Sequence, residues 1–156
     1  MQTSIDNGVI AYFVMEVGLC SEIPTYSGGL GILAADTLRA AADLNLPFVG
    51  VTLLYRRGYY KQILTPEGKQ IDELDDWSPS NYLTKLPVEI SVDLEGRSVR
   101  VGAWKIDVDS VNGSSVPLIF LDTNLDTNMP EDREITSLLY DDNRSNRLKQ
   151  EAVLGI

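Results

Sequence analysis

Residues 9–54 read VIAYFVMEVGLCSEIPTYSGGLGILAADTLRAAADLNLPFVGVTLL, with two apolar runs on either side of a glycine-rich turn and a helical pattern. Residues 9–15 are continuously apolar, β-branched and aromatic, which is typical of a buried parallel strand. Residues 32–44 carry apolar side chains at helical spacing, and residues 48–54 form the second apolar run. Strand, glycine turn, helix and strand form a βαβ unit, which we expect to cross over right-handed.

After residue 54 the hydrophobic pattern changes first to that of antiparallel strands and then to that of helices. Partial alternation predicts strands with a tight turn at Glu95-Gly96, then a short apolar strand returns the chain to the sheet, and helical spacing follows. The predicted strands are residues 59–64, 88–94, 97–108 and 116–121, and the predicted helices are residues 131–140 and 143–154. The fold class is therefore α/β, a Rossmann-like parallel sheet with an antiparallel β insert, divided into the βαβ unit 9–54, the insert 59–121 and the helices 131–154.

Composition limits the function. The 156 residues include 13 basic and 23 acidic side chains, giving a net charge of −10, and no histidine. Nucleic-acid binding is excluded on this balance, because phosphate contacts need clustered Lys and Arg. Arg56 and Arg57, which lie among tyrosines, are therefore interpreted as salt-bridge or sugar-phosphate contacts. One domain is the expected count at this length.

Cys20 is the single cysteine of the chain, so it predicts neither an intrachain disulfide nor, without histidine, a zinc site. We expect it to be a small buried apolar residue. The first residues lack the basic and apolar regions of a signal peptide, and no apolar run reaches the roughly 20 residues of a membrane span. A reducing cytoplasm and no membrane partner are the expectations.

The glycine loop Ser27-Gly28-Gly29-Leu30-Gly31 is the strongest candidate binding site. Its glycines allow close backbone approach, and its unpaired amides at a helix start favour an anion such as a phosphate or a sugar phosphate. The pattern is neither a Walker A loop nor the dinucleotide fingerprint. The alternative is a purely structural strand-to-helix turn.

Three further groups of residues are candidate sites. Glu16 follows the first strand, at the edge where α/β sheets bind ligands, and the alternatives are an exposed loop carboxylate or a helix-cap partner. Residues 72–77 place carboxylates beside Trp77, either for a sugar or as a solvated acidic turn anchored by a buried tryptophan. The charges near the end of the chain are interpreted as ordinary helix-face charges: Arg144, Arg147, Lys149 and Glu151.

Six segments, in order along the chain, resemble the α-glucan phosphorylases that act on glycogen, starch or maltodextrin, and more closely their short bacterial and archaeal form. They are AYFVME (11–16), YSGGLGILAAD (26–36), LPFVGV (46–51), YRRGY (55–59), DDW (75–77) and RLKQEAVLGI (147–156). The apolar ending of the last segment leads us to expect that the chain is the opening part of a longer protein.

The resemblance implies the start of the N-terminal domain of a two-domain GT-B fold. Its implied activity is retaining cleavage of a terminal α-1,4-glucosidic bond by inorganic phosphate, which releases glucose 1-phosphate. Pyridoxal 5′-phosphate would act through its phosphate group, with its attachment lysine outside this chain. The implied partners are an α-1,4-glucan, phosphate and glucose 1-phosphate, and a homo-oligomer is compatible with the family.

The resemblance also assigns roles to the candidate residues. Gly28 and Gly29 would offer amides to the phosphate region, Leu30 and Gly31 would border the glucosyl pocket, and Glu16 would face the site. The family's lysine, phosphate-gripping basic residues and glucosyl-contacting histidine have no match here, so we expect no complete catalytic set and no turnover by this chain alone.

Two alternatives stay open on the sequence. A synthase-like GT-B transferase also has a Gly-Gly-Leu-Gly loop, but its characteristic lysine just before the loop is replaced here by Tyr26-Ser27. A non-catalytic carbohydrate-binding module is the second alternative.

Overall fold

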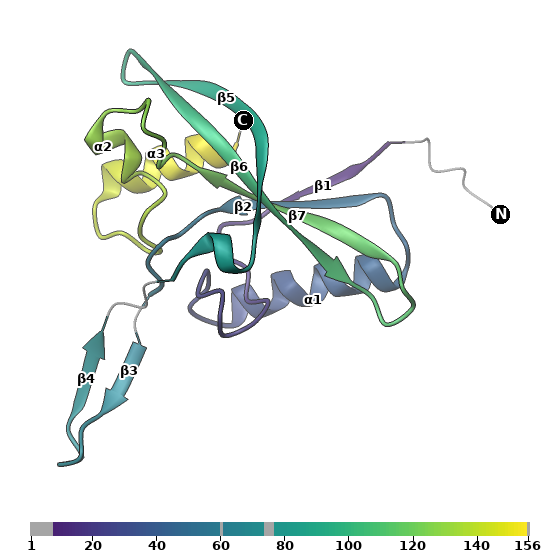
Figure 1. The fold of residues 1–156 in the computed structure, drawn as a ribbon, viewed down its shortest axis with the longest axis horizontal. Helices are drawn as coiled ribbons and strands as arrows, with labels where there is room; N and C mark the ends of the chain where they lie inside the picture. Colours follow the sequence, from purple (N-terminus) through teal and green to yellow (C-terminus); the bar gives the residue numbers. More distant parts are fainter. Residues whose placement is uncertain (1–7, 60, 74–76, 156) are drawn as a thin grey trace.

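The computed structural model describes residues 8–59, 61–73 and 77–155, and a five-stranded sheet forms its centre (Figure 1). The first three strands in the order pair in parallel and the last three pair antiparallel, so the architecture is mixed α/β. The order is β1 (Ile10–Phe13), β2 (Phe48–Leu53), β7 (Ser115–Asp122), β6 (Arg97–Asp109) and β5 (Thr84–Leu94).

Helix α1 (Gly29–Asp43) joins β1 to β2 along one face of the sheet, which confirms the predicted βαβ unit (Figure 1). Close approach of helix and sheet depends on Gly50 in β2, where an added Cβ would lie only 2.7 Å from Cδ2 of Leu38. The buried apolar residues on this side of the sheet include Ala34, Ala35, Leu38, Ala41, Ala42, Val116, Leu118 and Phe120.

Strand β1 is not buried as its apolar sequence predicts. It lies at the edge of the sheet, and Ile10 and Phe13 are 43% and 48% exposed. A continuous apolar run is typical of a strand with neighbours on both sides. Within the described residues β1 pairs with β2 alone, so its second edge is open.

The antiparallel strands β5 and β6 lie between β2 and β7 in the chain and join the same sheet, because β6 pairs with β7. The tight turn at Glu95-Gly96 is confirmed, with φ angles of 51° and 77° at its two residues. Strand β5 carries a register shift between Lys85 and Glu89, on either side of Pro87. A proline and an irregular register are characteristic of an edge strand.

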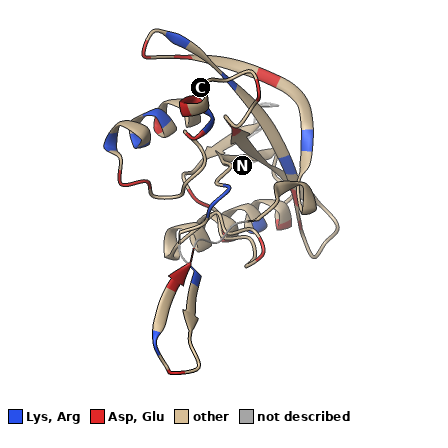
Figure 2. Cartoon of the chain, turned by 60° about the vertical axis from the view of Figure 1, so that its left-hand side comes forward, with Lys and Arg blue, Asp and Glu red and all other residues tan. Residues whose placement is uncertain are grey.

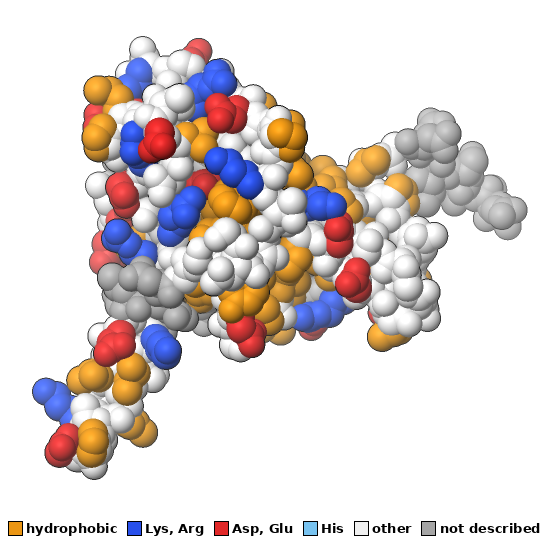
Figure 3. All heavy atoms as spheres, viewed as in Figure 1, with side chains coloured by type: hydrophobic (Ala, Val, Ile, Leu, Met, Phe, Trp, Pro, Cys, Tyr) orange, Lys and Arg blue, Asp and Glu red, His pale blue; other side chains and the backbone are white. Residues whose placement is uncertain are grey.

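A separate hairpin projects from the body of the molecule (Figures 1 and 3). Its strands are β3 (Lys61–Leu64), which lies within the predicted strand 59–64, and β4 (Gln70–Glu73), which was not predicted. The sequence of β4, QIDE, contains one apolar residue and therefore gives no alternating signal. Leu64 is 73% exposed, so the hairpin adds little to the core.

One of the two helices predicted near the C-terminus is present in the structure, and the other is not. Helix α3 (Arg144–Leu154) is confirmed and begins after Asn143, whose side chain accepts from the amides of Ser145 and Asn146. The helix predicted over residues 131–140 is wrong, because only one turn, α2 (Pro130–Arg133), is helical. The following backbone bonds instead to Arg57, whose amide donates to Ser137 O at 3.0 Å and whose carbonyl accepts from Leu139.

Helices α2 and α3 cover the opposite face of the sheet from α1, so the molecule has three layers (Figure 1). A short 3-10 turn, η1 (Pro79–Asn81), precedes β5. The buried apolar residues of this second layer are Leu53, Tyr55, Leu94, Val99, Val101, Ile135, Leu139, Val153 and Leu154.

A bidentate ion pair connects α2 to the turn between β5 and β6. Arg97 donates through Nη2 to Asp132 Oδ1 at 2.7 Å and through Nε to Oδ2 at 2.9 Å. The Asp132 side chain is buried, and the hydrogen bonds from Arg97 hold the pKa of Asp132 below its ordinary value of 3.8. Stability from this pair is therefore present above pH 3.8 and is lost as the pH falls through the lowered pKa.

Replacing Arg97 with methionine is expected to lower the stability of the protein at neutral pH, because Asp132 stays buried without its partner. The difference from wild type should shrink as the solution is acidified below pH 3.8, the ordinary pKa of this carboxyl. Urea unfolding of both proteins across that pH range measures this difference. Arg39→Met is the control, since the Arg39–Asp36 pair is exposed on both sides. A difference that stays constant on acidification would contradict the assignment.

Candidate functional site

The glycine loop forms the N-terminus of α1. Gly28 is the N-cap residue, with extended backbone angles (φ −160°, ψ −158°) and no side-chain cap. Its carbonyl accepts from Gly31 N at 3.1 Å. Within the part of the chain that the structure describes, the amides of Gly28, Gly29 and Leu30 donate no hydrogen bond. Three free donors at the positive end of a helix are the elements of an anion site.

The carboxylate of Glu16 holds this loop in place. Glu16 is only 3% exposed, and it lies just beyond the carboxyl end of β1 as predicted. Its Oε2 accepts from Ser27 N at 3.0 Å and its Oε1 accepts from Gly31 N at 2.9 Å. The helix-cap alternative therefore describes its contacts, and the exposed-carboxylate alternative is wrong. By occupying these two amides, Glu16 leaves the three between them free.

The glycines of the loop differ in what surrounds them. An added Cβ at Gly28 or Gly29 would meet no atom within 4 Å, so both positions face open space. At Gly31 it would lie 2.5 Å from Cβ of Tyr26 and 3.3 Å from Gly18 N. Gly28 and Gly29 are thus available to a ligand, whereas Gly31 is required by packing. Leu30 is 69% exposed beside them.

A cavity of about 470 Å³ lies against the loop, and its lining carries both signs of charge. Ser27 lies on the loop side, while the other lining residues come from the segment before α3, from α3 itself and from Tyr59. Figure 2 shows that acidic and basic residues alternate along that segment and α3. The lining residues are Ser27, Tyr59, Tyr140, Asp141, Asp142, Arg144 and Arg147.

Three of the lining residues, Tyr140, Asp141 and Asp142, are not identified from the sequence. Burial raises the pKa of the Tyr140 hydroxyl, and the negative charge of Glu16 raises it further. Tyr140 and Ser27 of the glycine loop line the same cavity. The place of Tyr140 could not be read from the chain, because it lies in the segment wrongly predicted to be helical.

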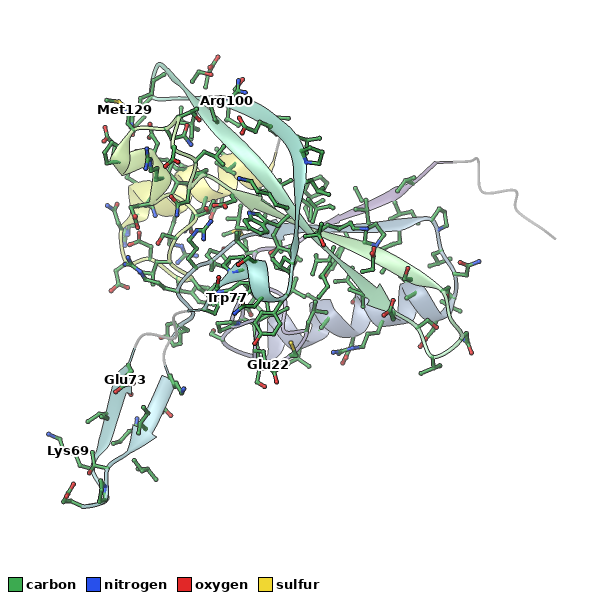
Figure 4. All side chains as sticks on the ribbon, in the orientation of Figure 1. Glu22, Lys69, Glu73, Trp77, Arg100 and Met129 are labelled. Atoms are coloured by element: carbon green, nitrogen blue, oxygen red, sulfur yellow. The ribbon has the colours of Figure 1, made fainter. Side chains whose placement is uncertain are left out.

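The carboxylates of residues 72–73 and the ring of Trp77, which the sequence places in one candidate site, lie apart in the structure. Asp72 and Glu73 are exposed on β4 of the projecting hairpin, while Trp77 lies on the body of the molecule and donates to the carbonyl of Tyr55 at 2.8 Å (Figure 4). Residues 74–76 of this cluster lie outside the described residues. Trp77 is half-buried rather than fully buried.

Two further candidates, Arg56 and Lys149, form ion pairs within the protein. Arg56 donates to the buried Asp122 at 2.6 Å, which confirms the salt-bridge interpretation, and Trp104 donates to the same carboxylate oxygen. Tyr60 of the same cluster lies outside the described residues. Lys149 pairs with Glu95 at 2.9 Å. Cys20 is exposed, so the expectation that it is buried is wrong.

The described part of the chain holds neither a candidate metal cluster nor a candidate membrane-spanning helix. No group of carboxylates and cysteines there could hold a metal ion. No helix in the same part of the chain is both long and apolar enough to cross a bilayer.

Comparison with known proteins gives consistent matches. The family described as carbohydrate phosphorylase matches residues 22–149. The chain is 38% identical to the maltodextrin phosphorylase of Thermococcus litoralis, 38% identical to the glycogen phosphorylase of Mycobacterium tuberculosis and 35% identical to that of Aquifex aeolicus. Each match covers 94% of this chain but only 18%, 17% and 21% of the respective relative, so the chain spans about a fifth of their length.

Proposed function

The chain belongs to the carbohydrate phosphorylase family, and on this basis we propose that it is the N-terminal part of an α-1,4-glucan phosphorylase with GT-B architecture. The whole protein transfers the terminal glucosyl unit of glycogen or a maltodextrin to inorganic phosphate, with retention, and releases glucose 1-phosphate. We propose the cytoplasm as its compartment and leave a homo-oligomer as a compatible assembly. The family supports phosphorolysis over the sugar-nucleotide transfer of a synthase.

The observation that carries the proposal is the row of free amides on the glycine loop. Gly28 and Gly29 donate to a phosphate group, because their amides are unused and the space beside them is open. Fixed backbone donors at a helix N-terminus stabilise an anion without reorganising when it binds. Leu30 and Gly31 border the glucosyl pocket, and Glu16 orients the loop.

The phosphorylase family in general suggests pyridoxal 5′-phosphate as cofactor. The free amides of this chain fit a phosphate group, whereas the described residues that line the adjoining cavity include arginine and no lysine. The chain would therefore contribute to the phosphate region, and the attachment lysine would come from the rest of the protein. The cofactor's phosphate group supplies proton exchange with the substrate phosphate when bound.

Phosphorolysis by the whole protein tests this proposal. Incubated with a maltooligosaccharide, it is expected to release glucose 1-phosphate only when inorganic phosphate is present. ADP-glucose offered to the same protein is the control for a transferase and should leave the glucan unextended. Glucan binding without turnover would instead support the carbohydrate-binding module and overturn the proposal.

A further inference from the structure

The two edges of the central sheet differ in sequence. Strand β5, at one edge, contains Pro87 and has a register shift between Lys85 and Glu89, two charged residues. Prolines, charges and irregular register are the features that keep an edge strand from pairing with a further strand. Strand β1, at the other edge, reads IAYF within the run VIAYFVM of residues 9–15, which contains no charge and no proline. Strand β5 therefore has the sequence of an edge strand, whereas β1 does not.

Apolar side chains of the β1 segment lie on both faces of the sheet. Tyr12 and Val14 pack against the apolar cluster on the α1 face, and Met15 packs against the cluster on the α3 face. Ile10 and Phe13 nevertheless remain 43% and 48% exposed. A strand that is apolar on both faces is typical of the interior of a parallel sheet, where it has a neighbour on each side.

The backbone of β1 directs amides toward its open side. Ile10 N donates to Pro47 O at 2.7 Å and Val14 N donates to Val51 O at 3.0 Å, so both of these amides point toward β2. Because successive amides of a strand point to opposite sides, those of Ala11 and Phe13 point away from β2. A row of outward-pointing donors and acceptors is a template for one more strand.

The positions of the helices indicate on which side of the sheet a further parallel strand is added. Helix α1 joins β1 to β2 on one face, whereas α3 follows β7 on the opposite face (Figure 1). Val153 and Leu154 of α3 share an apolar cluster with Leu53 of β2, so α3 already lies back over β2. Crossovers between parallel strands are right-handed, so a helix on the opposite face adds its strand in the opposite direction. That direction leads from β7 past β2 to the open edge of β1.

We infer that the open edge of β1 is paired by a parallel strand that follows α3 in the whole protein. The relatives have the length to supply it, because this chain covers only 17% to 21% of them. The inference rests on the proposed place of this chain in a longer phosphorylase, and not on phosphorolysis itself. The order of the strands reverses between β1 and the added strand, and α/β sheets bind ligands at the carboxyl ends of such a pair. Glu16 already lies at that end of β1, so the residues after the added strand border the candidate site.

Hydrogen exchange of the whole protein, resolved at the single amides of residues 10–14, tests this inference. The amides of Ala11 and Phe13 are expected to exchange at least about 100-fold more slowly than unstructured amides, as those of Ile10 and Val14 do on the side of β2. Fast exchange at Ala11 and Phe13 beside slow exchange at Ile10 and Val14 would overturn it. Slow exchange that depends on protein concentration would assign the edge to a second copy of the protein, which would overturn it as well.

Ala11→Pro in the whole protein distinguishes a paired strand from a helix or loop that only covers the edge. Ala11 is exposed in this chain, and proline removes its outward-pointing amide. Proline is tolerated where such an amide faces no partner, but it breaks the ladder between two paired strands. The urea midpoint is therefore expected to fall in Ala11→Pro and to stay at the wild-type value in Ala11→Ser, the matched control that keeps the amide. Equal midpoints in the two variants would contradict the pairing.

These measurements do not depend on activity, so the two proposals can fail separately. If Ala11 and Phe13 exchange slowly in a protein that shows no phosphorolysis, the proposed function fails and the pairing of β1 stands. If the protein carries out phosphorolysis while these two amides exchange fast, the pairing fails and the proposed function stands.

Discussion

Glu16→Ala in the whole protein is expected to lower kcat/KM for phosphate about 100-fold, the size of effect seen when a fixed anion-binding donor is lost. The carboxylate holds the amides at both ends of the loop, at 3.0 Å for Ser27 and 2.9 Å for Gly31. Without it Ser27 N loses its acceptor and Gly31 N keeps only the Gly28 carbonyl. The loop then no longer presents its free amides in one orientation. Steady-state kinetics with phosphate as the varied substrate measures the loss.

Stability should fall as well in Glu16→Ala, by about 1–3 kcal/mol, because two hydrogen bonds to a buried charged group are lost. Glu16→Gln is the matched variant. It keeps one acceptor oxygen but turns an NH2 group toward the second amide, so its kinetic loss should be smaller, about tenfold. An alanine variant with wild-type KM for phosphate would show that Glu16 does not organise the site.

Gly29→Ala is expected to weaken phosphate binding without lowering stability, whereas Gly31→Ala is expected to lower stability. At Gly29 the new methyl group meets no protein atom within 4 Å, so the fold should tolerate it. The methyl would lie in the open space beside the free amides, where a phosphate has to approach. The KM for phosphate should rise by about 10- to 100-fold, with no loss of unfolding free energy.

At Gly31 the expected result is the reverse, because the methyl group would overlap the side chain of Tyr26 at 2.5 Å. Overpacking of this kind costs about 1–3 kcal/mol of unfolding free energy. Urea unfolding of the two variants, together with their kinetics, measures the separation. Wild-type phosphate affinity in Gly29→Ala would contradict the assignment of that glycine to the site.

The sequence predicts the parts of this fold that depend on neighbours along the chain. The βαβ unit follows from two apolar runs and one helical pattern, and the hairpin turn follows from Glu95-Gly96. The helix predicted over residues 131–140 failed because Arg57, far away in the sequence, bonds to that backbone. No local pattern contains a partner so distant.

In the candidate site, too, the sequence predicts the features that depend on local pattern but not the contacts between distant residues. Glu16 could be placed at the end of its strand and the glycine loop at the start of its helix, because both positions follow from element boundaries. The sequence could not reveal that Glu16 bonds to the amides of Ser27 and Gly31. Tyr140 lines the same cavity as Ser27, and it has a left-handed backbone angle, which no propensity predicts for a tyrosine.

A crystal structure of the whole protein soaked with inorganic phosphate and a maltooligosaccharide tests the central claim most directly. A phosphate group, of substrate or cofactor, should accept hydrogen bonds from Gly28 N and Gly29 N at about 2.7–3.2 Å, with Glu16 still bonded to Ser27 and Gly31. Phosphate bound elsewhere, with the amides of this loop facing solvent or another part of the protein, would contradict the account.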